Sequence, residues 1–229
     1  MHKPSRQVRS NGITTVGYRH SSKCESMVQI ESSLERKFLT LLEFDPNVIR
    51  YSDQPVKILY KDELGNSRSY TPDFLVDYRH RKSVYYEVKY ESYLKANQKE
   101  VKRKFDAARQ FAKECSCEFK VFKDTQINSV YQENVEFLLG YVSQSIESET
   151  EDIIVRELRK VKTSTPANLI RLVSDCLENE SKLIRPLWIL IANRVIGCNL
   201  FATLEMNSPI WLVTKNRSFK QLSYPYHYA

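Results

Sequence analysis

The 229-residue sequence predicts an α/β core with a mixed sheet, followed by a smaller domain of three helices and a hairpin. Three observations lead to this fold class. A helical pattern precedes four strand-like runs, a second helical pattern leads to a fifth strand, and a Ser- and Glu-rich stretch at 143–152 then divides the chain. Helices on the faces of a sheet bury the apolar stripes that such patterns create.

The core elements follow from the spacing of apolar residues. Leu34 and Phe38, with Leu41 and Leu42, lie on one face of a helix predicted over 31–44. Ser32 or Ser33 caps its start, and Asp45-Pro46-Asn47 ends it. Apolar or alternating runs predict strands over 48–51, 56–60, 69–78, 83–90 and 118–122.

Two more helices complete the predicted core. The first, over 95–114, has an inner stripe of Val101, Phe105, Ala108 and Phe111, and its lysines, Lys104 included, lie largely outside this stripe. The second helix spans 130–141. Because strands and helices alternate in this order, the sheet is expected to be mixed.

The second domain has the element order of a winged helix. Helices are predicted over 153–161, 166–176 and 183–196, and strands over 199–204 and 210–214. We therefore divide the chain into a basic N-terminal arm (1–30), a core (31–143), a linker (144–152) and a winged-helix-like domain with an aromatic tail (153–229). The arm is either a solvated terminus or a segment that contacts phosphates.

Composition limits the classes of function. The formal net charge of +7 favours an acidic partner such as nucleic acid. Five cysteines without zinc-ligand spacing indicate reduced thiols. No apolar run approaches the roughly 20 residues of a membrane span, and there is no secretory signal, so we expect a soluble intracellular protein with no membrane partner.

The candidate chemistry lies in Pro72-Asp73 and, fourteen residues further on, Glu87-Val88-Lys89. Phosphodiester hydrolysis needs a hard cation held by carboxylate oxygens, which Asp73 and Glu87 can supply. Lys89 can place a positive charge near the attacking water and the developing charge on the phosphate. A turn near residues 80–81 would bring Asp73 opposite 87–89, with Glu87 and Lys89 on one face of a strand.

An alternative is a half-exposed strand with alternating charges, which is what an isolated Glu-x-Lys usually is. The Pro-Asp at this distance, between apolar strands, favours the catalytic interpretation. A third carboxylate could come from Glu35 or from Glu31, which lies one turn earlier on the first helix.

Together, these motifs resemble those of the TnsA endonuclease family. The resemblance is carried by Glu35 in Ser-x-Leu-Glu-x-x-Phe-Leu, the run from Leu42 to Val48, Gln54-Pro55, Pro72-Asp73-Phe74 and Glu87-Val88-Lys89. It implies a PD-(D/E)xK, restriction-endonuclease-like catalytic domain followed by a winged-helix-like domain, in a bacterial cytoplasmic protein.

The resemblance also implies a site and a reaction. Glu35, Asp73, Glu87 and Lys89 would be catalytic. Mg²⁺, with Mn²⁺ as a substitute, would be held by Glu35, Asp73, Glu87 and the backbone carbonyl of Val88. Some family members carry glutamine at the position of Glu87, so this side chain either ligates the metal or supports the site. The substrate would be double-stranded DNA at transposon ends, cut at the 5′ ends, with a TnsB-like transposase and a TnsC-like AAA+ ATPase as partners.

The rival interpretations are a stand-alone nuclease with the same core, such as a resolvase or restriction enzyme, and a non-catalytic DNA-binding regulator with a degenerate core. The third helix of the second domain, with its apolar run 186–192, is too apolar to lie in a DNA groove. This run is either core or a protein-docking face, and we expect the domain to bind a partner protein. The aromatic tail either docks on a partner or packs on its own domain.

Overall fold

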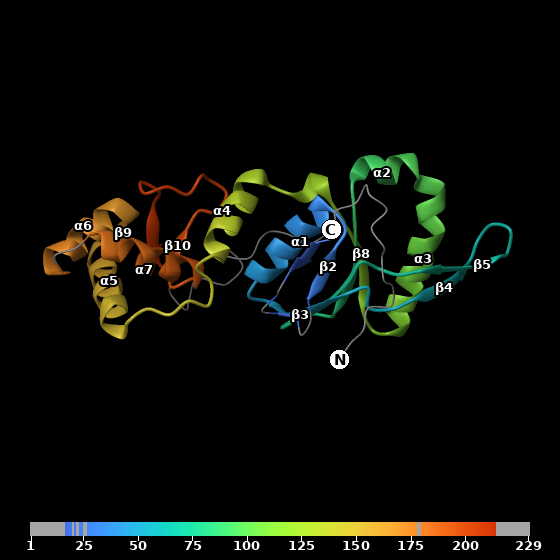
Figure 1. Cartoon of the computed structure of the whole chain (residues 1–229), viewed down its shortest axis with the longest axis horizontal. Coiled ribbons are helices and arrows are strands. Elements are labelled where there is room, and N and C mark those ends of the chain that lie inside the picture. The colour runs from blue at the N-terminus through green and yellow to red at the C-terminus, as the bar shows by residue number, and fades with distance from the viewer. Residues whose placement is uncertain (1–16, 20, 22, 25–26, 178–179, 214–229) are drawn as a thin grey trace. The chain divides into compact units, whose positions relative to one another are not determined.

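A computed structural model describes residues 17–19, 21, 23–24, 27–177 and 180–213 of the chain. The chain forms two compact units, Met1–Ile127 and Asn128–Ala229 (Figure 1). Most of the predicted arm at 1–30 and the whole aromatic tail lie outside the described residues, so both predictions about them stay open. Among the described residues, no helix has the length and apolar character needed to cross a bilayer.

A four-stranded mixed sheet forms the centre of the first unit. Its strands are β3 (Val48–Asp53), β6 (Phe74–Tyr78), β7 (Val84–Lys89) and β8 (Glu118–Lys123), in the order β3-β6-β7-β8. β3 and β6, and β6 and β7, are antiparallel, whereas β7 and β8 are parallel. This confirms the predicted α/β core with a mixed sheet. A short pair, β1 (Gly17–Arg19) and β2 (Val28–Ile30), precedes it.

Two helices cover the two faces of this sheet (Figure 1). On α1 (Ser33–Phe44), the ring of Phe38 lies 4.6 to 5.7 Å from the rings of Phe74, Tyr86 and Phe122, which belong to β6, β7 and β8. On the other face, α3 (Gln98–Glu114) places Phe105 near Phe119, and Phe111 near Tyr85. Such buried aromatic pairs fix the helices against the sheet.

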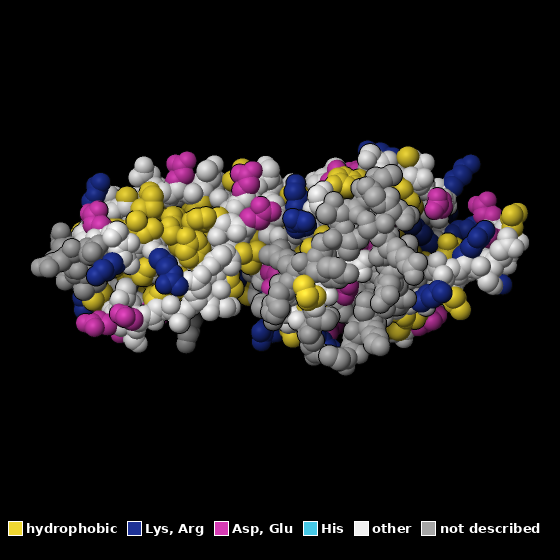
Figure 2. Space-filling view, viewed as in Figure 1, with side chains coloured by type: hydrophobic (Ala, Val, Ile, Leu, Met, Phe, Trp, Pro, Cys, Tyr) yellow, Lys and Arg dark blue, Asp and Glu magenta, His cyan; other side chains and the backbone are white. Residues whose placement is uncertain are grey.

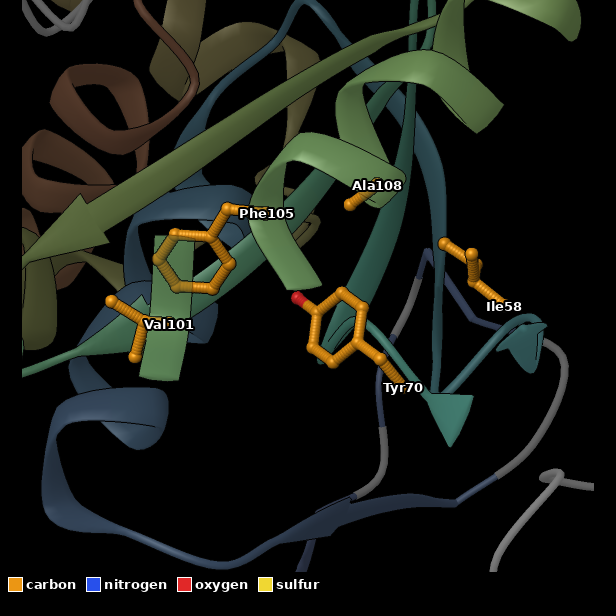
Figure 3. Close-up of a cluster of buried hydrophobic side chains, with 5 residues drawn as sticks. All are labelled: Ile58, Tyr70, Val101, Phe105 and Ala108. Carbon is orange, nitrogen blue, oxygen red and sulfur yellow. The ribbon is translucent and has the colours of Figure 1, made fainter. Parts of the chain in front are cut away.

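The strands β4 (Ile58–Lys61) and β5 (Ser67–Tyr70) form a separate antiparallel pair, which we call the ribbon. One face of the ribbon packs on α3, where Ile58 and Tyr70 join Val101, Phe105 and Ala108 in a buried cluster (Figure 3). The prediction of one strand over 69–78 was therefore wrong. Proline cannot donate a ladder hydrogen bond, and Thr71-Pro72 separates β5 from β6.

Other boundaries of the first unit differ slightly from prediction. Ser32 is the residue that caps α1, since its side chain accepts a hydrogen bond from the backbone N–H of Glu35. The helix predicted over 95–114 is two helices, α2 (Glu91–Ala96) and α3, which meet at Asn97. A single 3-10 turn, η1 (Asp124–Gln126), follows β8.

The second unit contains four helices in its described part and a three-stranded antiparallel sheet. The helices are α4 (Ser129–Leu139), α5 (Ser148–Val161), α6 (Pro166–Leu177) and α7 (Ser181–Ala192). The strands β9 (Thr163–Ser164), β10 (Ile196–Cys198) and β11 (Ile210–Leu212) pair in the order β10-β11-β9. The three helices from α5 to α7 agree with the predicted ones, but the hairpin pairs 196–198, and not the predicted 199–204, with β11. The winged-helix assignment stays a prediction.

The division between the units falls at 127/128, earlier than the expected linker at 144–152. The reason is α4, which the sequence analysis placed in the first domain (31–143) and which belongs to the second unit. Its Asn134 donates to the carbonyls of Leu200 and Ala202, and its Phe137 ring lies 5.1 Å from that of Trp188. In addition, α5 starts at Ser148, inside the expected linker, with acidic residues in the first turn, where the helix dipole favours them.

Two further predictions for the second unit are resolved by packing. The strand predicted over 199–204 is wrong, because those residues form turns whose backbone groups bond to the side chain of Asn134. The apolar stretch of α7 is core, since the residues from Leu187 to Ala192 are all buried. A docking role for this face is thereby excluded.

Candidate active site

Asp73 stands between the ribbon and β6, where it joins several elements. Its backbone carbonyl accepts a hydrogen bond of 2.8 Å from the N–H of Gln54. Its Oδ2 accepts from the backbone N–H of Val88 at 2.7 Å and from Lys89 Nζ at 3.2 Å. Phe74 pairs with Tyr86 in the β6–β7 register, so the predicted turn near residues 80–81 is confirmed and Asp73 lies opposite the end of β7.

Glu87 and Lys89 lie on one face of β7, as the period of two along a strand predicts. Lys89 Nζ lies 3.2 Å from Asp73 Oδ2, 3.2 Å from Glu87 Oε1 and 3.2 Å from the carbonyl oxygen of Val88. Glu87 is buried, with 2% of its surface exposed, and its Oε2 accepts a hydrogen bond of 2.5 Å from the hydroxyl of Tyr70. Val88, between Glu87 and Lys89, is buried.

Glu35 joins this group from the first turn of α1. Its Oε1 accepts from the hydroxyl of Ser32 at 2.9 Å, and its Oε2 accepts from the backbone N–H of Glu31 at 2.8 Å. Burial and then the neighbouring Asp73 carboxylate raise the pKa of Glu35 to about 7. Desolvation and a like charge both disfavour the ionised form of a carboxyl group.

Glu31, the alternative candidate, has a different place. Its carboxylate accepts a hydrogen bond of 2.9 Å from Gln54 Nε2, while its backbone N–H holds Glu35. Gln54 has φ of 43°, a value that is strained for a residue with a side chain. Gln54 thus contacts both the Asp73 carbonyl and Glu31, and links the two parts of the site.

The electrostatic environment sets the charge states of the remaining groups. Burial and then Asp73 raise the pKa of Glu87. Burial by itself would lower the pKa of Lys89, but Asp73 and Glu87 outweigh it and raise this pKa above its usual range. Lys89 is therefore a cation at neutral pH, held between two carboxylates.

Sequence reasoning missed two residues, Tyr70 and Lys104. Lys104 was expected on the outer side of its helix, yet its side chain is 15% exposed and its Nζ lies 3.9 Å from Glu87 Oε1 and 5.5 Å from the centre of the Tyr70 ring. The available signal was its position on α3, three residues after Val101 and four before Ala108, at the edge of the buried stripe.

The donor chemistry of these residues fits a hard divalent cation in part. Carboxylate and carbonyl oxygens are what Mg²⁺ prefers, and Glu35, Asp73 and Val88 present them. Burial and then repulsion by Asp73 raise the pKa of Glu35, and a bound cation would remove the repulsion. Across the described part of the chain, however, no cluster of three or more Asp, Glu, His or Cys side chains has metal-holding geometry. Glu87 is instead engaged by Tyr70, Lys89 and Lys104.

The fold resembles that of α/β nuclease cores, with Asp73 just before β6 and with Glu87 and Lys89 on the adjacent antiparallel strand β7. The comparison with protein families agrees with this class. Residues 45–124 match the family described as TnsA-like endonuclease N terminal, so this part of the chain is similar to the nuclease domain of that family. The match includes Asp73, Glu87 and Lys89 and begins after Glu35. A search of curated proteins found no match.

Proposed function

We propose that this protein is a Mg²⁺-dependent DNA endonuclease that cuts the 5′ ends of a transposon. It would act with a TnsB-like transposase, which cuts and joins the 3′ ends, and with a TnsC-like AAA+ ATPase. The observation that carries the proposal is the contact of Lys89 Nζ with Asp73 and Glu87, within a segment that matches the TnsA-like endonuclease domain.

Each residue of the site has a distinct role in this proposal. Glu35 and Asp73, with the carbonyl of Val88, would hold the metal ion, for which Mn²⁺ is a substitute. The ion would supply a Lewis acid and lower the pKa of a bound water. Glu87 is assigned a supporting role, because its carboxylate is buried and is bonded to Tyr70 and to two lysines.

Lys89 would act through its charge. Its ammonium group is anchored to Asp73 and Glu87, so its position is fixed before the substrate binds. A positive charge held in a partly buried site stabilises negative charge that develops on a phosphate without first having to reorganise.

The partner-binding role predicted for the second unit also remains part of this proposal. The apolar face of α7 does not serve it, since that face is core. Partly exposed apolar side chains elsewhere in the unit, such as Leu172, Ile184 and Phe201, leave other surfaces for a partner.

The proposal is tested by reconstituted transposition with the neighbouring transposase proteins. Wild type should give simple insertions, whereas Asp73→Ala should still join 3′ ends but leave the 5′ flanks attached and give cointegrates. Asp77→Ala is the matched control. Asp77 lies on β6, four residues after Asp73, and is bonded to Arg50 and Ser83 rather than to the site.

The other outcomes identify the rival functions. Identical products from wild type and Asp73→Ala would refute the catalytic proposal and leave a DNA-binding or scaffolding role. Cleavage of DNA by this chain without partner proteins, lost in Asp73→Ala, would indicate a stand-alone nuclease of the same core type.

A further inference from the structure

The ribbon β4–β5 has two faces of different character. Along its strands, side chains alternate between the face that packs on α3 and the face that points outward. The inward face holds Ile58 and Tyr70, which are buried in the cluster of Figure 3. The outward face holds Leu59, which is 75% exposed, and Lys61, Ser67 and Ser69, which are all exposed. Lys57, just before β4, has the same parity and is exposed too.

The charges of the two faces also differ. Between the ribbon and α3 lies a hollow of about 480 Å³ lined by three acidic and three basic side chains, namely Asp62, Glu63 and Glu100 with Arg68, Lys99 and Arg103. Some of these groups form ion pairs, Arg68 with Asp62 at 2.9 Å and Arg103 with Glu63 at 3.5 Å. The outward face has Lys57 and Lys61, two serine hydroxyls and no acidic residue. Figure 2 shows basic and acidic side chains together at this end of the molecule.

The ribbon that carries this outward face is joined directly to the candidate active site. Tyr70, the last residue of β5, donates to Glu87, and only Thr71 and Pro72 separate it from Asp73. From the pair Ile58–Tyr70 to the pair Lys61–Ser67 there are three steps along the ribbon, or about 10 Å. That length corresponds to about three base pairs of duplex DNA, so the ribbon would lie beside DNA whose phosphate occupies the site.

We propose that the outward face of the ribbon binds the phosphate backbone of duplex DNA next to the cleaved bond, through Lys57, Lys61, Ser67 and Ser69. This inference rests on the proposed nuclease function and adds a substrate-binding surface to it. Lysine and serine are side chains that contact phosphates and fix the position of a protein on DNA. A two-stranded antiparallel ribbon also has the width to enter the major groove.

The ribbon is built to keep this shape. Asp62 at its turn accepts hydrogen bonds from the backbone N–H groups of Leu64 and Asn66 and from the side chain of Arg68. Gly65 has φ of 78°, which the turn requires and which glycine adopts without strain. Lys61 Nζ bonds to Ser67 Oγ at 2.9 Å across the two strands. A rigid surface of this kind loses little entropy when it binds DNA.

The test is binding of the full-length protein to a short fluorescently labelled duplex in EDTA. The binding constant is measured by fluorescence anisotropy at a series of salt concentrations. If both lysines contact phosphates, the double variant Lys57→Gln/Lys61→Gln should have a shallower dependence of log K on log salt, with a slope smaller in magnitude by about 1.8. It should also bind the duplex on the order of 60-fold more weakly at about 0.1 M salt. Replacing both lysines by arginine should keep wild-type binding, since the charge is retained.

Lys82→Gln is the matched control. Lys82 is an exposed lysine in the turn between β6 and β7, at the end of β7 away from Lys89, and its loss should leave the slope unchanged. A wild-type slope in the double variant, an equal loss with Lys82→Gln, or no duplex binding by wild type would overturn the proposal. So would a double variant that binds DNA normally but no longer binds the transposase, which would make the ribbon a protein-docking surface. Binding in EDTA is independent of cleavage. The ribbon proposal can therefore fail while the Asp73→Ala result supports the nuclease function, and the nuclease function can fail while the ribbon still binds DNA.

Discussion

Replacing Glu35 by glutamine should stabilise the metal-free protein at alkaline pH and not at acidic pH. Burial and Asp73 raise the pKa of Glu35 from 4.5 to about 7 in the folded state. The folded protein therefore holds this proton more tightly than the unfolded chain does. The contribution of Glu35 to stability is most favourable below pH 4.5 and becomes less favourable as the pH rises to about 7.

The magnitude follows from this interval. At about 1.4 kcal/mol per pH unit, the rise from 4.5 to about 7 corresponds to about 3 kcal/mol of lost stability at pH 8. Glutamine removes this cost. It also weakens one of the two hydrogen bonds that Glu35 accepts from Ser32 and Glu31, and this loss offsets about 1 kcal/mol of the gain in stability. For a chain of this size, the net gain of about 2 kcal/mol raises Tm by roughly 5 °C.

The assay is thermal unfolding of wild type and Glu35→Gln in EDTA at pH 5 and at pH 8. The difference in Tm should favour the variant at pH 8 and vanish or reverse at pH 5. Glu157→Gln is the control, because the pKa of Glu157 is lowered by Lys160 and its replacement should not stabilise the protein at pH 8. Equal Tm differences at both pH values would refute the assigned environment of Glu35. Adding Mg²⁺ at pH 8 should raise the Tm of wild type more than that of the variant.

Two further substitutions test the packing around the site and in the second unit. Tyr70→Phe removes the hydroxyl that donates to buried Glu87 and should cost about 2 kcal/mol in urea unfolding, whereas an unchanged midpoint would show that this bond is not formed. Gly197→Ala would place a methyl group 2.6 Å from Trp211 Nε1 and should cost about 1–3 kcal/mol. Calorimetry should show this loss only in the transition of the second unit, and a single shifted transition would mean that the two units unfold together.

The local part of the site could be predicted because it depends on short-range geometry. Once a turn is placed near residues 80–81, the antiparallel register fixes which residues lie opposite Asp73. The period of two along a strand then puts Glu87 and Lys89 on one face. Similarly, the apolar spacing of α1 and its capping serine needed no information beyond one helix.

The groups that sequence analysis missed depend on contacts between distant segments. Tyr70 reaches Glu87 only because the ribbon leaves the sheet at Thr71-Pro72, and a run of alternating residues does not reveal such a break. Lys104 approaches Glu87 from a helix that crosses the other face of the sheet. In the second unit, Asn134 bonds to a loop more than sixty residues later, and this contact replaced a predicted strand with turns.

The charges of the site also decide what Lys89 can do. A lysine that removes a proton from water at neutral pH needs a pKa lowered towards 7, as burial without partners produces. Here Asp73 and Glu87 contact Lys89 Nζ and raise its pKa, so the ammonium form is the stable one. The groups in this site whose pKa lies near neutrality are carboxyls, those of Glu35 and Glu87. Binding of a cation at Glu35 and Asp73 would release the Glu35 proton, and metal affinity should therefore increase with pH up to about 7. Glu35 and Glu87 are thus the groups that exchange protons near neutral pH, and Lys89 provides a fixed positive charge.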